Sequence, residues 1–408
     1  MPHISQRAQN APQSPIRRLG PFADAAKARG IDVIHLNIGQ PDIDSPPEFW
    51  DAILRNHPRI LEYSHSAGNE SLRRKMRKTY ERILGISLQE GDLMVTTAAS
   101  EAVCFSMLAC CNAEEEVIVP EPLYANYLGF AAVSTIRMVG VPGCIEDNFA
   151  LPSAEEIAQY ITPKTRAILI CNPNNPSGAI YGRADLLALS KVCLQNDLFL
   201  ISDEVYREFN YTNERPPSVL ELPGLEQHAI LIDSVSKRYS LCGARLGYLV
   251  TKNKDVMSAA MRFAMARLSP PGLAQIGVEG ALEVPDSYFE EMCEEYRGRR
   301  DLLVSRLRAI PGVLCPQVDG AFYAMVRLPI DDSDRFCRWL LESFSHKNRT
   351  VMLAPGTGFY VTAGRGKDEV RIAYVLNKDR ISEAMDCLEV ALATYPGRKI
   401  TASTAARS

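Results

Sequence analysis

Side chains that can bind ligands or react come directly after several short apolar segments of the chain. Each segment is rich in Val, Ile and Leu, which is typical of a buried strand. The side chains are those of Ser100 after segment 93–97, Tyr124 after 116–120, Asn175 after 166–171, Asp203 and Tyr206 at the end of 198–203, and Ser234, Ser236 and Lys237 after 229–233. Ligands of an open α/β sheet bind beyond the carboxyl ends of its strands, so we expect these side chains to share one pocket.

Part of this set suits a phosphate group. Ala98, Ala99 and Ser100 open a predicted helix, where free backbone N–H groups and the helix dipole favour an anion. Ser234 and Arg245 could reach the same phosphate, the arginine as a bidentate donor. We therefore predict an anion site beside the start of this helix.

The rest of the set suits an aromatic ring held by an amine. Lys237 lies among apolar segments, where a lysine can serve as the nucleophile of a Schiff base. Asp203 can keep a pyridine nitrogen protonated, Tyr206 can donate to a phenolate oxygen, and Tyr124 can stack on a ring. Taken singly, such residues have ordinary explanations, because strand-ending aspartates usually cap helices and lone lysines are usually solvated. Their order along the chain favours one cofactor site.

The composition argues against several other classes of function. A formal net charge of -4 and a pI near 6.0 provide no basic surface for nucleic acid or acidic lipid. The 11 cysteines show neither a C-x-x-C pair nor the spacing of a zinc site, so we expect reduced thiols and no metal. No segment reaches the roughly 18 apolar residues of a membrane helix, and residues 1–13 lack the apolar core of a signal peptide. We therefore expect a cytoplasmic protein.

Between about residues 15 and 395 the chain resembles the class I/II aminotransferases. The shared motifs are S-x-S-K at 234–237, R-x-G-Y at 245–248, S-D-E-x-Y at 202–206, N-P-N-N-P-[ST]-G at 172–178, L-x-I-G-x-P-D at 36–42, Y-x-x-x-x-G-x-x-x-L-R at 63–73 and V-R-[IL] at 370–372. Any one of them is weak evidence, since the Asn-Pro-Asn-Asn-Pro run alone is typical of a turn. In combination they are highly specific.

The resemblance implies pyridoxal 5'-phosphate (PLP) as the cofactor and Lys237, Asp203 and Tyr206 as the catalytic residues. Lys237 would form the Schiff base and shuttle the proton, and Asp203 would pair with the pyridinium nitrogen. The implied cofactor-binding residues are Lys237, Ala99, Ser100, Tyr124, Asn175, Asp203, Tyr206, Ser234, Ser236, Arg245 and Tyr63. The implied substrate-binding residues are Gly39, Asn175 and Arg371, with Arg371 on the α-carboxylate. Tyr63 would reach the phosphate of a neighbouring subunit, which implies a homodimer with shared active sites.

The resemblance also implies an α/β architecture, the PLP-transferase fold type I. This fold has a large domain, whose mixed and mostly parallel sheet carries helices on both faces, and a smaller α/β domain. The sequence agrees, because apolar runs alternate with helical stretches as far as residue 251. The expected parts are an N-terminal segment 1–50 packed on the small domain, a large PLP-binding domain 51–285, a small C-terminal domain 286–396 and a frayed tail 397–408.

We therefore predict a PLP-dependent aminotransferase that moves an amino group between an L-amino acid and a 2-oxo acid, of the aspartate/2-oxoglutarate type. The alternative is another PLP reaction on the same scaffold, such as β-elimination or decarboxylation, because the lysine and ring contacts are common to all of them. Arg371 and Gly39 favour amino transfer because they hold a free α-carboxylate. A PLP-binding regulator is disfavoured, since only about 30 residues precede Leu36, too few for a winged helix.

Two positions depart from the family pattern. Many relatives have Gly-Gly where this chain has Ala98 and Ala99, so its phosphate loop is less free in φ and ψ. Some acid-preferring relatives have a lysine in place of Ser100, which binds the distal carboxylate of the substrate. Arg262 and Arg267 are candidates to replace that lysine by their proximity in sequence alone. The amino donor is left open by the sequence.

Overall fold

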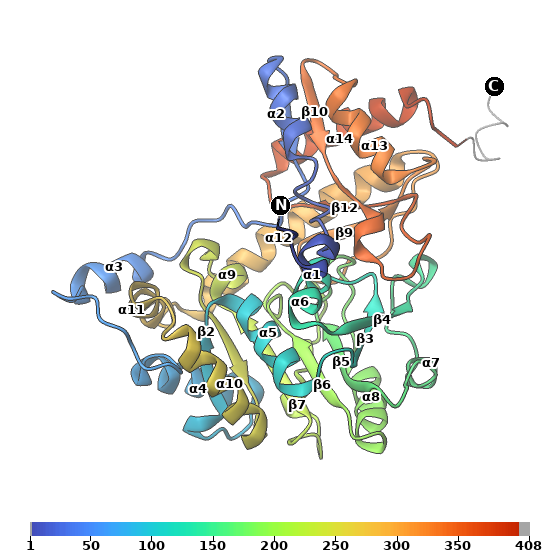
Figure 1. The fold of residues 1–408 in the computed structure, drawn as a ribbon. Helices are drawn as coiled ribbons and strands as arrows, with labels where there is room; N and C mark the ends of the chain where they lie inside the picture. Colours follow the sequence, from blue (N-terminus) through green and yellow to red (C-terminus); the bar gives the residue numbers. More distant parts are fainter. Residues whose placement is uncertain (1, 400–408) are drawn as a thin grey trace.

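The computed structural model describes residues 2–399 and contains a large mixed sheet (Figure 1). In spatial order its strands are β2 (Leu93–Thr96), β8 (Gly247–Val250), β7 (Ala229–Ser234), β6 (Phe199–Asp203), β5 (Thr165–Cys171), β3 (Glu116–Glu121) and β4 (Arg137–Pro142). Within this sheet β8 runs antiparallel to both of its neighbours, and the other pairs are parallel. The predicted mixed, mostly parallel sheet is confirmed.

Helices cover both faces of this sheet because successive side chains of a strand point to opposite faces, and on its inner strands both are apolar. On β5, for example, Leu169 belongs to one core and Ile168 to the other. The first core is shared with α5 (Ala98–Cys110), α6 (Asn126–Ser134) and α10 (Lys254–Arg267). The second core is shared with α4 (Glu70–Leu84), α7 (Ala154–Ala158) and α8 (Arg183–Gln195).

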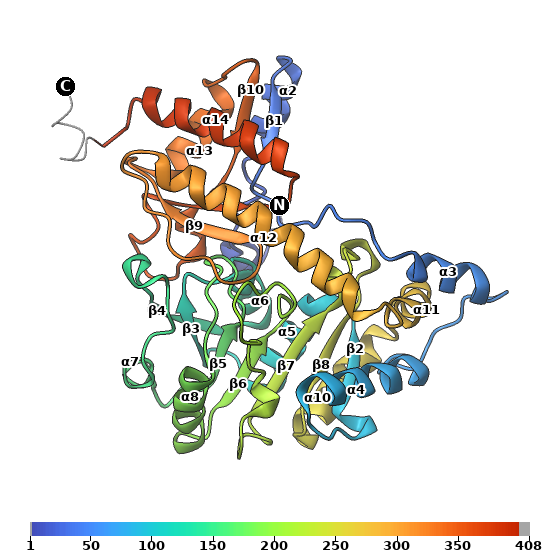
Figure 2. The ribbon, with the colours of Figure 1, turned by 180° about the vertical axis from the view of Figure 1, so that it is seen from behind.

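The residues after 285 build a second region that stands over one end of the large sheet (Figure 2). Its antiparallel sheet has the order β11 (Ala354–Pro355), β12 (Glu369–Ala373) and β9 (Tyr323–Arg327). Its helices are α12 (Asp286–Ala309), α13 (Ser333–Glu342) and α14 (Lys378–Thr394). The long helix α12 reaches from the neighbourhood of α11 (Gly272–Ala281) into this second region, so it connects the two parts of the molecule.

The N-terminal residues contact both parts. The short helix α1 (Gln6–Asn10) lies against α6, whereas α2 (Gly20–Ala28) packs on α13. Strand β1 (Asp32–His35) pairs in parallel with β10 (Arg349–Met352), and α3 (Pro47–Asn56) packs on α11. Residues between α1 and α2 therefore cross from one part of the molecule to the other. The expected boundaries at residues 50, 285 and 396 stay predictions, and residues 400–408 of the expected tail lie outside the described residues.

Candidate active site

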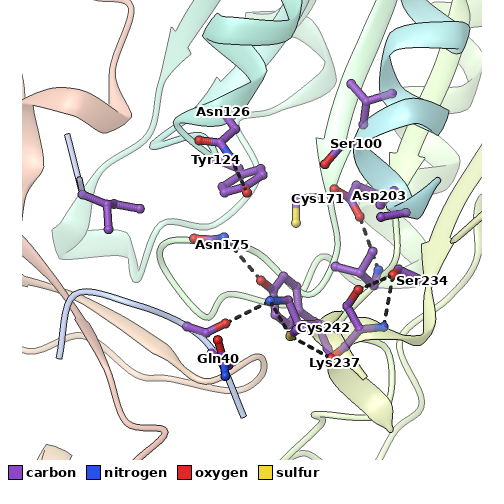
Figure 3. A pocket seen from close by; sticks show the side chains of 18 of the residues that line it. Gln40, Ser100, Tyr124, Asn126, Cys171, Asn175, Asp203, Ser234, Lys237 and Cys242 are labelled. Carbon is purple, nitrogen blue, oxygen red and sulfur yellow. Dashed lines mark hydrogen bonds between the residues drawn. The ribbon is translucent and has the colours of Figure 1, made fainter. Parts of the chain in front are cut away.

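A cavity of about 530 Å³ lies between the carboxyl ends of the large sheet and the second region (Figure 3). All the residues to which the family resemblance assigns a catalytic, cofactor-binding or substrate-binding role line it except Tyr63. They arrive from separate elements, so that Tyr124 follows β3, Asn175 follows β5, Asp203 ends β6 and Lys237 follows β7. The side chains that follow separate strands therefore share one pocket, as expected, whereas the role of each residue stays a prediction.

Lys237 lies on α9 (Val235–Arg238), a single turn of helix directly after β7. The hydroxyl oxygen of Ser234 caps this turn by accepting a hydrogen bond from the backbone N–H of Ser236, at 3.1 Å. The Lys237 amine is half-buried and donates to the carbonyl oxygen of Gly39 at 2.9 Å. Its other contact is a weak one to the Cys242 Sγ at 3.9 Å, and the amine makes no ion pair within residues 2–399, so it can turn toward a ligand in the cavity.

Asp203 is a buried carboxylate without a cationic partner among residues 2–399. Its oxygens accept hydrogen bonds from the Tyr127 hydroxyl at 2.7 Å and from the Val205 backbone N–H at 3.4 Å. Burial raises the pKa of Asp203 from its ordinary value of 3.8 to about 6, although the Tyr127 hydrogen bond opposes the shift. A cation bound in the cavity beside this group would keep it ionised.

Three hydroxyl and amide groups lie close together in the lining of the cavity. The Asn175 amide lies 3.4 Å from the Tyr206 hydroxyl, which is 3.1 Å from that of Tyr323. Burial raises the pKa of Tyr206 well above its ordinary value, so the phenol keeps its proton and remains a donor. Gly39 has no Cβ because one would overlap the Tyr323 ring, and this close approach brings the 36–42 segment against the cavity.

The predicted phosphate site lies at the start of α5. Its first backbone N–H groups have no acceptor within the helix, and its first residues, Ala98, Ala99 and Ser100, line the cavity together with Arg245. Ala98 has a left-handed φ of 61°, which costs a residue with a Cβ roughly 1 kcal/mol and explains why glycine is common here in relatives. A Cβ on Gly247 would collide with the Ala98 backbone. The Ser234 hydroxyl donates to the Leu246 carbonyl at 2.9 Å, so it must turn away from that oxygen to bind a phosphate.

Arg371 on β12 is 1% exposed and makes no ion pair with any residue from 2 to 399. One guanidinium nitrogen donates to the Asn175 side-chain oxygen at 3.0 Å and another to the Asn37 carbonyl at 2.6 Å. The third nitrogen, Nε, has no partner within the described chain. A buried charge is costly unless it is paired, so the cavity needs an anion from a ligand at this point.

Other predicted residues lie away from the cavity. Tyr63 is 80% exposed, and its suggested place in a partner's site stays a prediction. Arg262 and Arg267, the candidates for a distal carboxylate, do not line the cavity of this chain. The guanidinium of Arg267 already pairs with Glu101 at 3.0 Å, and Arg262 donates to the Ser258 hydroxyl at 3.2 Å.

The sequence argument missed several residues that line the cavity. They are Ser14, Ile16, Arg17, Ile38, Gln40, Val103, Asn126, Phe130, Cys171, Val205, Cys242 and Tyr323. Asn126 could have been found, because it lies two residues beyond Tyr124 in the same connection after β3. Arg17 and Tyr323 follow no strand of the large sheet, so no local signal marks them.

Comparison with known proteins places this geometry in a family. The sequence model of the family of aminotransferases of class I and II matches residues 31–388 of this chain. The chain belongs to this family. An aspartate aminotransferase of Bacillus subtilis (strain 168) is 31% identical over 374 residues, which are 89% of this chain and 92% of the relative. Aromatic-amino-acid aminotransferase 2 of Thermococcus litoralis is 30% identical and covers 95% of this chain and 98% of its own.

The solved structure of aspartate aminotransferase from Thermus thermophilus with maleate has a TM-score of 0.87 at 27% identity. The superposed residues make up 96% of this chain and 100% of the solved chain. The predicted family, the fold type I architecture and the enzyme class of PLP-dependent aminotransferases are therefore confirmed. The relatives are named for different amino donors, so membership in the family does not define the substrate of this aminotransferase.

Two further features of this aminotransferase concern residues 2–399. No helix in that range has both the length and the apolar character to cross a membrane. The same range contains no group of three or more His, Cys, Asp or Glu side chains arranged to hold a metal ion.

Proposed function

We propose that this aminotransferase binds PLP at Lys237 and exchanges amino groups between dicarboxylic L-amino acids and 2-oxo acids, with aspartate and 2-oxoglutarate as the substrate types. The observation that carries the proposal is the buried Arg371 guanidinium, which lacks an anionic partner within residues 2–399 and opens onto the cavity that contains Lys237. Every amino acid and every 2-oxo acid has a planar carboxylate that fits such a group. Decarboxylation would remove the group that Arg371 holds, so the arginine favours amino transfer.

The lining of the cavity fits PLP at both ends of that molecule. The start of α5, with Ser100 and Arg245, offers donors to a phosphate. Asp203 lacks a cation, and a protonated pyridine nitrogen would supply one. The negative phosphate would thus lie at the donors of α5, and the positive ring nitrogen would lie at Asp203. Both ends of PLP therefore support the same orientation of the cofactor in the cavity. When bound, PLP supplies an aldehyde that accepts the amino group and a ring that takes up negative charge from the substrate Cα.

The side chains of the chain would divide the remaining work. The Lys237 amine would hold the cofactor and would move a proton to or from the substrate Cα. The Asp203 carboxylate keeps a proton on the ring nitrogen, and the Tyr206 hydroxyl donates to the ring oxygen together with Asn175. Arg371 orients the α-carboxylate, so that the Cα–H bond faces Lys237.

Asp203→Asn is expected to stabilise the cofactor-free protein while it lowers turnover. The folded wild type has a pKa of about 6 at Asp203, above the ordinary 3.8, so the folded state binds more protons than the unfolded state between these values. The contribution of Asp203 to the stability of the wild type is therefore fully present below about pH 4 and is lost as the pH rises through 6. Two pKa units correspond to about 3 kcal/mol, the largest gain expected of the asparagine near pH 8.

Urea unfolding of both cofactor-free proteins at about pH 4 and pH 8 measures this effect. The two stabilities should converge at the lower pH and separate at the higher one. An asparagine variant that is less stable than the wild type near pH 8 would show that the buried carboxylate is stabilising, and the argument for a missing cation would be lost.

We also propose a homodimer whose active sites are shared. Tyr63 is 80% exposed, and several apolar side chains near it on α3 and in the following segment are exposed as well. These are Trp50, Leu54, Ile60 and Leu61. An apolar surface of this kind is typical of a protein interface.

Tyr63→Phe is expected to weaken retention of PLP, because one charge-assisted hydrogen bond from the partner to the phosphate is lost. Such a bond contributes roughly 1.5–3 kcal/mol, so the dissociation constant of the cofactor should rise by about 10- to 150-fold. Equilibrium dialysis against PLP gives the constant, and Tyr160→Phe, which alters another partly exposed tyrosine, is the control. Light scattering that finds a fully active monomer would remove the role assigned to Tyr63.

The proposed function itself is tested by a screen of the amino acids with 2-oxoglutarate, in which formation of glutamate is measured, and of glutamate with 2-oxo acids. Transfer that depends on the 2-oxo acid supports amino transfer. Release of carbon dioxide or ammonia without a 2-oxo acid would support decarboxylation or β-elimination instead.

A further inference from the structure

The N-terminal segment of residues 14–18, which crosses between the two parts of the molecule, supplies part of the cavity wall. Ser14, Ile16 and Arg17 line the same cavity as Lys237. The segment is tied to the substrate side, because the Asn37 amide donates to the Ile16 carbonyl at 3.3 Å while the Asn37 carbonyl accepts from Arg371 at 2.6 Å. Arg17 is thus next in sequence to Ile16, and Ile16 is connected to Arg371 through Asn37.

Two neighbouring arginines of this segment have different surroundings. Arg18 pairs with Asp334 and does not line the cavity. Arg17 lines the cavity and makes no ion pair with any residue from 2 to 399. It remains exposed to solvent, so an unpaired charge here costs little until an anion arrives.

A comparison of charges in the cavity shows what Arg17 can bind. The charged residues of the lining are Arg17, Lys237, Arg245, Arg371 and Asp203. Arg245 is assigned to the cofactor phosphate, Arg371 to the α-carboxylate, and Lys237 and Asp203 to the cofactor ring. Arg17 is the cation left without an anion, and a dicarboxylic substrate brings one more anion than a neutral amino acid does.

We propose that Arg17 binds the distal carboxylate of dicarboxylic amino donors and acceptors, and so determines the preference of the enzyme for them. This inference rests on the proposed function. Arg17 lines the cavity, and the backbone of its neighbour Ile16 is connected to Arg371 through Asn37, so the segment is anchored at the residue that we assign to the α-carboxylate. Its neighbours in the wall include the apolar Ile16, Ile38 and Phe130, which can contact an uncharged side chain but offer a carboxylate nothing. Polar residues of the lining such as Gln40 and Asn126 can offer a carboxylate neutral donors, whereas Arg17 can offer a charge-assisted contact, which is stronger. Discrimination between acidic and neutral donors is therefore assigned to Arg17.

Arg17→Met tests the inference, with Arg18→Met as a matched control that removes the same charge one residue away and outside the cavity. We expect Arg17→Met to lower kcat/KM by about 10- to 150-fold for aspartate, glutamate and 2-oxoglutarate, the value of one charge-assisted contact. Alanine and phenylalanine should change by less than about threefold, since they lack that contact. Arg18→Met should leave the ratio of acidic to neutral donors unchanged.

A binding experiment gives a readout without turnover. Calorimetric titration of the holoenzyme with maleate, a dicarboxylate, should show weaker binding to Arg17→Met by a similar factor, whereas binding of a monocarboxylate such as propionate should be unaffected. Equal losses on acidic and neutral donors, or no loss on either, would overturn the inference while amino transfer by the wild type stands. A wild type that transfers amino groups only from neutral donors would overturn both the inference and the dicarboxylic part of the proposed function.

Discussion

Lys237→Ala is expected to lower amino transfer by about 10³-fold or more, because both the covalent attachment and the proton transfer at Cα depend on this amine. The fold should persist. In the structure the Lys237 side chain makes one hydrogen bond to a carbonyl, that of Gly39 at 2.9 Å, and lies 5.8 Å from the Phe322 ring. Loss of such contacts at a half-buried side chain costs at most about 1.5 kcal/mol. Initial rates with aspartate and 2-oxoglutarate measure the effect, and thermal unfolding verifies the fold.

Lys237→Arg is the matched variant, because it keeps the positive charge but cannot be deprotonated in a protein. It should be as inactive as the alanine variant if the amine is a nucleophile and a base, and partly active if a positive charge alone is needed. Purified wild type should be yellow, and borohydride should fix the cofactor to the peptide that contains residue 237. Near-native transfer by Lys237→Ala would refute the assignment of the site.

The strands of the large sheet could be predicted because their inner members are buried on both faces. Continuous apolar runs such as 166–171 and 229–233 match β5 and β7 within one residue at each end. Strand β4 was missed, because it lies at the edge of the sheet, is half-exposed and contains Gly140 and Pro142. Strand β1 was missed for another reason, since its partner β10 lies more than 300 residues later and such pairing has no local pattern.

The residues of the candidate site likewise divide into those that a local sequence pattern could predict and those that it could not. Residues that follow strands of the large sheet, such as Asp203 and Lys237, could be placed together because parallel strands end at one edge. Arg267 was a candidate by closeness in sequence, which says nothing about direction, and its side chain pairs with Glu101 and does not line the cavity. Arg17 was overlooked, because it reaches the cavity only after the N-terminal segment packs across both parts of the molecule. The cytoplasmic location and the roles of single residues stay predictions.

Arg371→Lys is expected to impair every amino donor and every 2-oxo acid, because all of them share the α-carboxylate. A guanidinium offers two parallel donors to a carboxylate, whereas an ammonium group is a point charge on a flexible chain. The arginine is also positioned beforehand by Asn175, by the Asn37 carbonyl and by the Tyr323 ring 4.4 Å away, a geometry that lysine cannot copy. Loss of a bidentate contact in a buried site costs about 2–5 kcal/mol, or some tens to thousands of fold in kcat/KM.

The pattern across substrates distinguishes this effect from that of Arg17. Steady-state kinetics with aspartate, alanine and phenylalanine should show similar losses for Arg371→Lys, whereas amines that lack the α-carboxylate should react no worse than with the wild type if they react at all. Because Arg371 is 1% exposed, thermal unfolding must first show that the lysine variant is folded. Should a folded Arg371→Lys lose activity with only one donor, Arg371 would be reading a side chain. The α-carboxylate would then have to bind elsewhere, and Arg17 is the lining guanidinium that is not assigned to the cofactor phosphate.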